Sequence, residues 1–199
     1  TALATTIRSG LAVPRPLTAV ISESAALPPD GNPGQAWSDD VRGRFDDDVV
    51  AMGGRFIAGV GAYYAHRPTP HTVTHNDFRL DNLLFGTAEG GPPVAVVDWQ
   101  TVGVGPALSD VSYFLGAGLS VEDRRAHEEA LVREYHEALL AAGVEDFGWD
   151  RCWSDYRAFA FSGFHMAVLA SMIVERTDRG DAMFLAMAGR HGRQILDLD

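Results

Sequence analysis

Apolar and polar residues follow two different periods along the chain. Between residues 38 and 67 the apolar residues recur at a near-helical spacing, which predicts a helix with Ser38 as its N-terminal cap. Gly53 and Gly54 lie within this segment, and each disfavours a helix by about 1 kcal/mol relative to alanine. We therefore expect a helix here, with a potential break at the glycine pair.

Three short runs with strand character follow this helix. They are rich in β-branched and apolar residues, and they occupy residues 71–77, 82–86 and 94–100. Residues 87–93, TAEGGPP, contain two glycines and two prolines, which predicts a turn between the second and third strands.

The remaining pattern is helical. A short buried helix is expected at residues 107–118, with Pro106 near its first turn. Ser120 and Asp123 have the spacing of a capping box at the start of a longer helix, and Gly143 is a typical helix stop. Further helices are expected at residues 149–175 and 181–196.

The pattern divides the chain into two parts. Residues 1–37 are rich in Pro, Gly, Ser and Thr, which is typical of an irregular or edge segment. Residues 38–199 predict an α+β unit, in which a mostly helical body carries a few short strands. The densest cluster of polar residues lies on the strand-rich part of this unit.

Composition limits the partners of the chain. With 199 residues and 46% hydrophobic content, the chain is long enough for one compact core. A net charge of −11 argues against nucleic-acid partners and against anionic membranes, because both are bound by clustered cations. The sequence shows neither a signal peptide nor a long apolar run, so we expect a cytoplasmic protein.

Two absences in the sequence exclude several kinds of chemistry. All sixteen basic residues are arginine, so mechanisms that need a lysine, such as a Schiff base or a P-loop, are excluded for this chain. Cys152 is the only cysteine, which excludes an intrachain disulfide and a zinc site built from cysteines. We expect Cys152 to be a core residue.

Asp77, Asn82 and Asp98 are the polar residues that carry the strongest chemical signal. Asp77 and Asn82 lie five residues apart between two strands, and Asp98 ends the apolar run that follows. Each of them alone is most simply a turn former. Together they predict converging oxygen ligands, which suit Mg²⁺ with phosphate or water completing the coordination.

These segments resemble the aminoglycoside phosphotransferase and choline kinase family, which is related to the eukaryotic-type protein kinases. HNDFRLDN, at residues 75–82, is similar to the family's H-x-D-x-x-x-x-N motif, and VAVVDWQ is similar to its counterpart of the D-F-G segment. The downstream GVGPALSDVSYFL is similar to the stretch in which a proline and then an aspartate precede a buried helix. Asn76 and Gln100 resemble the ecdysteroid-kinase-like branch.

The resemblance implies roles for individual residues. Asp77 is similar to the catalytic aspartate that accepts or orients the proton of the substrate hydroxyl, and Asn82 and Asp98 are similar to the residues that hold Mg²⁺ on the nucleotide phosphates. Arg79 follows Asp77 by two residues, where both a phosphate contact and a surface salt bridge are open.

Two further residues are expected to support the site. The resemblance implies that His75 bonds to the backbone near the turn at Asp98 and is not a general base. Asp110 is expected to anchor the backbone of the catalytic loop, because a carboxylate inside an apolar helix needs hydrogen-bond donors.

The implied fold is the C-terminal lobe of a protein-kinase-like protein. Members of the family bind ATP between two lobes, and their N-terminal lobe carries a Gly-rich loop and a strand lysine. This sequence has neither feature, so we expect residues 38–199 to form the C-terminal lobe alone, with the N-terminal lobe missing. The implied reaction is transfer of the γ-phosphoryl group of ATP to a hydroxyl of a small molecule, with Mg²⁺ and ATP as cofactors.

Two other functions stay open. His66, His71 and His75, with Asp77 and Asp98, are candidate ligands of a metal-dependent hydrolase. On a strand, however, His71 and His75 would lie about 13 Å apart, which is too far for one ion. The other alternative is a catalytically silent kinase-like binding module. The acceptor, the choice between ATP and GTP, and the oligomeric state are not readable from the sequence.

A dinucleotide-binding loop is a weaker alternative. Residues 103–108 carry half of a G-x-G-x-x-G motif, but Leu108 stands where the last glycine belongs. A helix that opens at Pro106 explains this stretch better.

Overall fold

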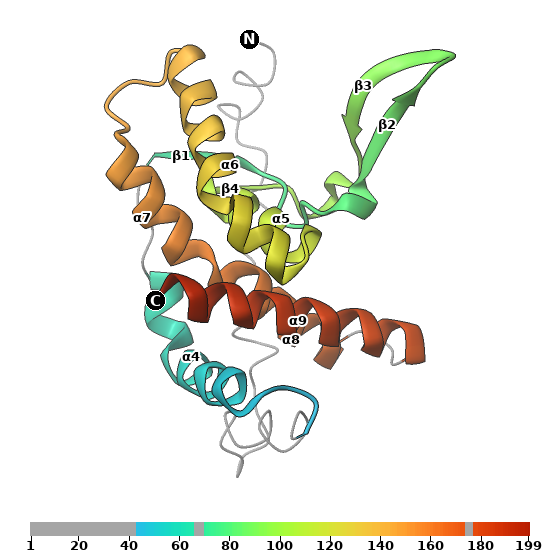
Figure 1. Ribbon diagram of the computed structural model, residues 1–199, viewed down its shortest axis with the longest axis vertical. Coiled ribbons are helices and arrows are strands. Elements are labelled where there is room, and N and C mark those ends of the chain that lie inside the picture. The colour runs from blue at the N-terminus through green and yellow to red at the C-terminus, as the bar shows by residue number, and fades with distance from the viewer. Residues whose placement is uncertain (1–42, 66–69, 174–176) are drawn as a thin grey trace, which may run out of the picture.

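The computed structural model describes residues 43–65, 70–173 and 177–199. The expected irregular segment at 1–37 and the expected cap Ser38 lie outside these residues. Within them the chain forms a body of packed helices from which one β-hairpin projects (Figure 1). The predicted mostly helical α+β architecture with a few short strands is therefore confirmed for the described part of the chain.

Helix α4 (Asp47–Ala65) begins later than the sequence predicted. Residues 43–46 are not helical, so the helix predicted at 38–67 is not continuous there, and its expected start at Ser38 lies outside the described residues. The acidic side chains of Asp46 and Asp48 lie at this end of the helix and both pair with Arg193 of the C-terminal helix. This contact ties the start of α4 to the other end of the chain.

Gly53 and Gly54 do not break α4. Val49, Met52 and Phe56 lie on one face of the helix and are at most 8% exposed. Burying each such side chain contributes about 1.5–3 kcal/mol, which outweighs the loss of about 1 kcal/mol at each glycine. Packing therefore keeps the helix continuous.

Strand β1 (His71–Thr74) pairs antiparallel with β4 (Gly103–Pro106), and Val73 lies opposite Val104. The sequence did not predict β4, because glycine and proline are depleted in strands. Pairing with β1 therefore holds residues 103–106 in a strand conformation that their own sequence does not favour. Pro106 ends this strand and lies two residues before α5 begins at Leu108, so it is near the first turn of that helix, as expected, but not within it.

Strands β2 (Leu83–Thr87) and β3 (Gly90–Val96) form the projecting hairpin, with Leu83 opposite Val96 (Figure 1). The turn between them is shorter than the predicted 87–93, because the Gly-Gly-Pro-Pro run belongs to β3. Gly90 and Gly91 have φ angles of 125° and 104°, which glycine adopts without a steric penalty. The two prolines are tolerated because β3 is an edge strand in a two-stranded sheet.

The helices that follow pack around one another (Figure 1): α5 (Leu108–Gly118), α6 (Val121–Ala141), α7 (Trp149–Phe159), α8 (Phe161–Ile173) and α9 (Asp178–Leu198). Ser120 accepts a hydrogen bond from the backbone N–H of Asp123 at 3.0 Å, and Gly143 follows the end of α6 with a φ of 87°. Both predicted boundaries of α6 are confirmed. Among the described helices, none combines the length and apolar character needed to cross a membrane.

The single helix predicted at 149–175 is in fact two helices that meet at Ala160. The backbone N–H of Ala160 donates to the carbonyl of Arg157 at 3.2 Å, which tightens the last turn of α7. Ala160 is 1% exposed, and Phe159 and Phe164 on either side are also buried. No proline marks the break in the sequence, so packing of both helices into one core places it.

Helix α5 lies at the centre of the helical body. It packs against α6, α7, α8 and α9, and Leu108 and Leu115 are buried in these contacts. At Gly116 a Cβ atom would lie 2.1 Å from Oε1 of Gln194 and 2.3 Å from Nδ1 of His191, both on α9. Glycine at this position therefore permits α5 and α9 to approach closely.

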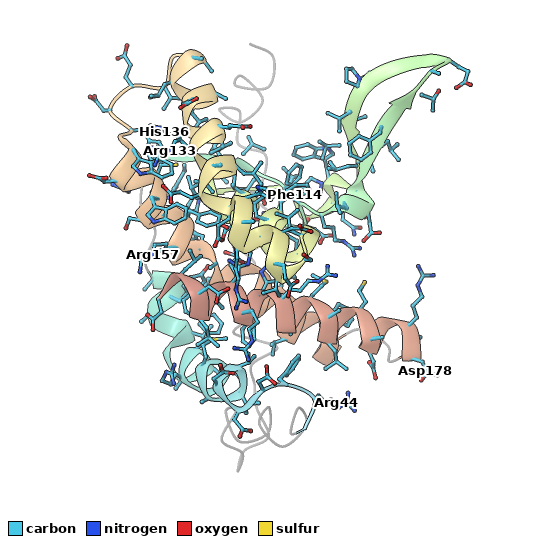
Figure 2. All side chains as sticks on the ribbon, in the orientation of Figure 1. Arg44, Phe114, Arg133, His136, Arg157 and Asp178 are labelled. Carbon is cyan, nitrogen blue, oxygen red and sulfur yellow. The ribbon has the colours of Figure 1, made fainter. Side chains whose placement is uncertain are left out.

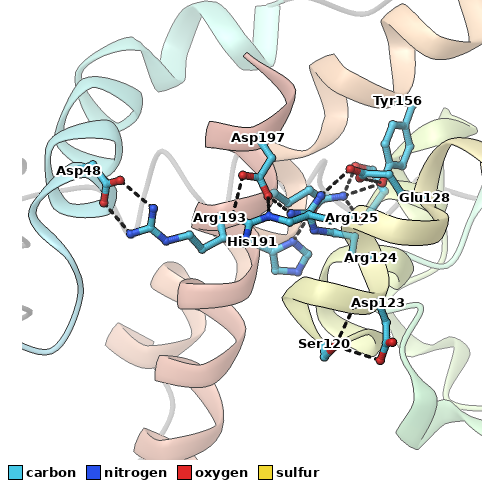
Figure 3. A network of polar contacts seen from close by, with 12 residues as sticks. Asp48, Ser120, Asp123, Arg124, Arg125, Glu128, Tyr156, His191, Arg193 and Asp197 are labelled. Atoms are coloured by element: carbon cyan, nitrogen blue, oxygen red, sulfur yellow. Dashed lines mark hydrogen bonds and ion pairs between the residues drawn. The ribbon is translucent and has the colours of Figure 1, made fainter.

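A buried polar network joins α6, α7 and α9 (Figure 3). Arg124 is 1% exposed, donates to Oε1 of Glu128 at 2.6 Å and pairs with Asp197. Tyr156 donates to Oε2 of Glu128 at 3.0 Å and accepts from Nε2 of Gln194 at 2.9 Å. These partners offset the cost of burying the charges of Arg124 and Glu128.

A cation–π contact and a hydrogen bond link α6 to the start of α7 and the residues just before it, through Arg133 and His136, which Figure 2 labels. The guanidinium of Arg133 lies 3.9 Å from the ring centroid of Trp149, and Nε2 of His136 donates to the backbone carbonyl of Phe147 at 2.7 Å. Cys152 is fully buried near the start of α7, so its prediction as a core residue is confirmed.

Gly116→Ala is expected to lower the free energy of unfolding by about 1–3 kcal/mol, because the new methyl group would overlap His191 and Gln194 in a packed core. Gly59→Ala in α4 is the matched control, since a Cβ there meets nothing within 4 Å. We expect the control to raise the free energy of unfolding by about 0.5–1 kcal/mol. Urea denaturation of both variants measures the difference, and equal effects at the two positions would contradict this account of the α5–α9 contact.

Candidate functional site

The segment at residues 75–82, here called the Asp77 loop, is held by one carboxylate of α5. Oδ2 of Asp110 accepts a hydrogen bond from the backbone N–H of His75 at 2.6 Å, and Oδ1 accepts one from the backbone N–H of Asn76 at 2.9 Å. Asn76 has a φ of 63°, in the left-handed region that asparagine tolerates better than most residues. Asp110 therefore fixes the path of the backbone just before Asp77.

The pKa of Asp110 reflects two opposing effects. Burial removes water from the carboxylate and raises its pKa, whereas the two backbone donors lower it. Burial is the larger effect, so the pKa of Asp110 lies above its ordinary value. The carboxylate that bonds to the loop is thus half-buried and partly shielded from water.

Val97 ties the Asp77 loop to the segment that carries Asp98. The backbone N–H of Val97 donates to the carbonyl of Asn82 at 3.0 Å, and its carbonyl accepts from Nε2 of His75 at 2.9 Å. Both polar backbone groups of Val97 are therefore used by the loop. Asp98, the next residue, is brought beside the loop as a consequence.

Asp98 lies beyond the end of β3, not within it as the predicted strand at 94–100 required. It has φ and ψ of 61° and 53°, a left-handed conformation that is uncommon for residues other than glycine. Asp98 is exposed, and its side chain forms no hydrogen bond with another described residue. Its carboxylate is therefore available for an external ligand.

The side chain of Asp77 receives a donor on each oxygen. Nδ2 of Asn82 donates to Oδ2 at 3.0 Å, and the hydroxyl of Tyr113 donates to Oδ1 at 3.0 Å. The backbone N–H of Asp77 donates to Nδ1 of His75 at 3.3 Å. The structure thus brings His75, Asp77 and Asn82 into one hydrogen-bonded group.

The orientation of the Asn82 amide follows from its partners. Nδ2 donates to the backbone carbonyl of Asp77 at 2.8 Å as well as to its carboxylate, and both of these groups can only accept. The nitrogen must therefore face Asp77, which leaves Oδ1 of Asn82 without a hydrogen bond to the described residues. Asn82 is 5% exposed, so this arrangement is held rigidly.

Arg79 forms ion pairs within the loop. Its Nε lies 3.3 Å from Oδ1 of Asp77, and its Nη1 lies 3.1 Å from Oδ2 of Asp81. Nη1 also lies 3.5 Å from the sulfur of Met183 on α9. The sequence left two roles open for Arg79, and the described structure contains the salt bridge. A contact between Arg79 and a phosphate stays a prediction.

Sequence reasoning missed four residues that shape the site. The hydroxyl of Thr101 donates to the carbonyl of His75 at 2.7 Å, and the carbonyl of Thr101 accepts from Nδ2 of Asn76 at 2.8 Å. A Cβ at Gly103 would lie 2.9 Å from that same Nδ2, so this position leaves room for the Asn76 amide. Val97 and Tyr113 are the other two residues.

One of these four had a signal in the sequence. Tyr113 lies three residues after Asp110, so both side chains lie on the same face of the helix. Since Asp110 was expected to anchor the loop, Tyr113 could have been expected to lie beside the loop as well. Val97 contributes through its backbone, Gly103 through the space that it leaves, and Thr101 through both its hydroxyl and its carbonyl, and residue type alone indicates none of these roles.

The described residues contain no group of three or more His, Cys, Asp or Glu side chains placed to bind one metal ion. His71 is exposed on β1 and His75 is bonded to Val97, so neither supports the metal-dependent hydrolase, and His66 lies outside the described residues. Residues 103–106 form strand β4, which also removes the dinucleotide-loop alternative. Asn82 and Asp98 still fit a Mg²⁺ ion, which commonly takes one or two protein oxygens and completes its shell with phosphate and water.

Comparison with known proteins places these residues in a family context. Residues 34–153, more than half of the chain, match the family described as the phosphotransferase enzyme family. An uncharacterized kinase-like protein of Caenorhabditis elegans is 32% identical over 97 residues, which are 49% of this chain and 24% of that protein. Acyl-CoA dehydrogenase family member 10 of Mus musculus is 28% identical over 160 residues, 74% of this chain and 14% of that protein.

The chain therefore spans about a quarter or less of the length of these two relatives. No solved structure matches it significantly.

Asp110→Asn is expected to lower the free energy of unfolding by about 1–3 kcal/mol, because the amide NH₂ would face one of the two backbone N–H donors and leave it unpaired. Asp150→Asn is the matched control: it also lies in the first turn of a helix, but it is exposed. Chemical denaturation measures the free energy of unfolding of both variants. Amide hydrogen exchange at His75 is expected to be slower in the wild type than in Asp110→Asn, which would assign the loss of stability to the bond between Asp110 and the loop. Exchange at His75 that is equal in both proteins would contradict the anchoring role.

Proposed function

The chain belongs to the phosphotransferase enzyme family, and on that premise we propose that it transfers the γ-phosphoryl group of a nucleoside triphosphate to a hydroxyl of a small molecule. The observation that carries this proposal is the pairing of Asp77 with Asn82, in which the amide nitrogen faces Asp77 and the amide oxygen stays free. Phosphoryl transfer depends mainly on positioning and on neutralising charge, and these residues suit both tasks.

Asp77 is the proposed contact for the acceptor. A carboxylate whose two oxygens are held by fixed donors keeps one orientation, and a hydroxyl that approaches it can be aligned for attack. Asp77 then orients the hydroxyl or accepts its proton as the new P–O bond forms. His75 and Asp110 hold the backbone on which Asp77 lies.

Asn82 and Asp98 are the proposed ligands of Mg²⁺. Among the described residues, neither the amide oxygen of Asn82 nor the carboxylate of Asp98 has a hydrogen-bond partner, and Val97 joins the two segments. When bound, the ion would supply positive charge that neutralises the charge of the nucleotide phosphates. Arg79 is a second proposed source of positive charge, on condition that it exchanges its ion pairs for a phosphate.

We further propose that residues 38–199 correspond to the C-terminal lobe of a protein-kinase-like fold. The helical body and the short strands that carry the loop support this assignment (Figure 1). The chain covers only part of each relative, so a separate nucleotide-gripping lobe belongs to the proposal as well. The net charge of −11 favours a cationic acceptor over an anionic one.

Asp77→Asn is expected to reduce phosphoryl transfer at least about a hundredfold without unfolding the protein, because the amide cannot accept the proton of the acceptor. Transfer from radiolabelled ATP to a panel of amino sugars, choline-like alcohols, sugars and steroid alcohols measures this, with thermal unfolding as the check on folding. Asp81→Asn is the matched control, since Asp81 lies in the same loop but is exposed. Turnover of Asp77→Asn at the wild-type rate would remove Asp77 from the mechanism.

Asp98→Asn is expected to weaken Mg²⁺-dependent binding of ATP by tenfold or more, because it removes the charge on a proposed metal ligand. Calorimetric titration with ATP, with and without Mg²⁺, measures the loss. The matched control is Asp146→Asn, which is exposed and has a φ of 57°, close to the 61° of Asp98. Equal affinity in the two variants, or binding that does not depend on Mg²⁺, would contradict the assignment of the phosphate site.

A further inference from the structure

Helix α5 holds the Asp77 loop at two points and not one. Asp110 and Tyr113 lie three residues apart, on the same face of the helix. Asp110 accepts the backbone N–H groups of His75 and Asn76, whereas Tyr113 donates its hydroxyl to Oδ1 of Asp77 at 3.0 Å. One contact fixes the backbone of the loop and the other reaches its catalytic side chain.

We propose that Tyr113 is a positioning residue, whose hydroxyl fixes the plane of the Asp77 carboxylate in the orientation that aligns the acceptor hydroxyl. This inference rests on the proposed phosphotransferase function, because the orientation of Asp77 matters only if Asp77 contacts an acceptor.

The donors around Asp77 show why one hydroxyl has this effect. A carboxylate can rotate about its Cβ–Cγ bond unless both oxygens are held. Asn82 holds Oδ2 at 3.0 Å, and Tyr113 is the residue that donates a hydrogen bond to Oδ1. Nε of Arg79 lies 3.3 Å from Oδ1, but this buried atom forms no hydrogen bond with the described residues. Without the hydroxyl of Tyr113, one end of the carboxylate would lack a directional contact.

Tyr113 is itself held by the core. It is 4% exposed, and its ring centroid lies 5.5 Å from that of His191 on α9. His191 is fully buried, and a Cβ at Gly163 would come within 2.1 Å of its ring, so the imidazole has little room to move. The position of the hydroxyl is therefore set by α5, α8 and α9 together.

The hydroxyl of Tyr113 stays protonated and can therefore always donate a hydrogen bond. Burial is the main cause that raises the pKa of Tyr113 above its ordinary value, and the neighbouring charge of Asp77 raises it further. The phenol therefore keeps its proton throughout the neutral range. A group that always donates can define an orientation, and it does not exchange protons with the acceptor.

Tyr113→Phe tests the inference, because it deletes the hydroxyl and keeps the ring that packs against His191. The matched control is Tyr156→Phe, which deletes a hydroxyl that is equally buried but bonded to Glu128 and Gln194 (Figure 3). Both variants lose a buried hydrogen bond, so both are expected to be less stable than the wild type. A loss of stability alone therefore does not distinguish them.

The first readout is spectroscopic and needs no activity. In the carbon-13 NMR spectrum of the labelled chain at one fixed pH, Tyr113→Phe is expected to move the side-chain carboxyl signal of Asp77, and Tyr156→Phe is expected to leave it in place. The reciprocal change, Asp77→Asn, is expected to move the signal of the ring carbon that bears the Tyr113 hydroxyl. An Asp77 signal that is the same in the wild type and in Tyr113→Phe would overturn the inference.

The second readout is kinetic and uses Mg²⁺-ATP with water as the acceptor. Tyr113→Phe is expected to lower kcat about tenfold with little change in KM for ATP. A loss of about tenfold in kcat is the effect expected when a hydrogen bond to a charged group is removed. Tyr156→Phe is expected to keep kcat near the wild-type value. An unchanged kcat in Tyr113→Phe, or a change confined to KM, would overturn the positioning role.

The two proposals fail in different ways. A wild-type chain that neither hydrolyses ATP nor phosphorylates any acceptor in the panel contradicts the proposed function, and a catalytic meaning for Tyr113 falls with it. An active wild type whose Tyr113→Phe variant matches it in kcat and in the Asp77 signal contradicts the inference alone.

Discussion

The carboxylate of Asp110 accepts the two backbone N–H groups that precede Asp77, and the path of the Asp77 loop depends on this interaction. The bonds hold Asn76 in a left-handed conformation, which turns the chain so that Asp77 and Asn82 face each other. They also bring His75 to Val97, and thereby bring Asp98 beside the loop. The carboxylate is half-buried, and this burial raises its pKa and reduces the competition from water for the two hydrogen bonds.

The helical body supplies the rigidity of this anchor. Helix α5 packs against each of the four helices that follow it, so its first turn cannot move independently of the core. Close approach of α5 to α9 requires the missing side chain at Gly116, and the space is filled by His191 and Gln194. His191 is neutral at physiological pH, because burial lowers its pKa to about 4. The interior beneath the site therefore combines polar atoms with close packing.

The site has a fixed part and an open part. Asp77, Asn82 and Tyr113 hold one another through hydrogen bonds that involve both oxygens of the Asp77 carboxylate. Asp98, in contrast, is exposed and lacks a side-chain partner among the described residues, although its backbone is tied to the loop through Val97. This division suits phosphoryl transfer, in which the group that aligns the acceptor benefits from rigidity and the metal ligand receives its remaining partners from the substrate.

The sequence by itself indicated the candidate residues for the chemistry and the two ends of α6. The spacing of Asp77, Asn82 and Asp98 indicated a shared site, and Ser120 and Gly143 marked the ends of α6, because capping depends on neighbours in the chain. Only the tertiary structure decided the pairing of β1 with β4, the continuity of α4 through its glycines and the break between α7 and α8. It also placed Val97, Thr101 and Tyr113 in the site. These features depend on contacts between residues far apart in the chain, whose energies exceed the local preferences that a sequence pattern records.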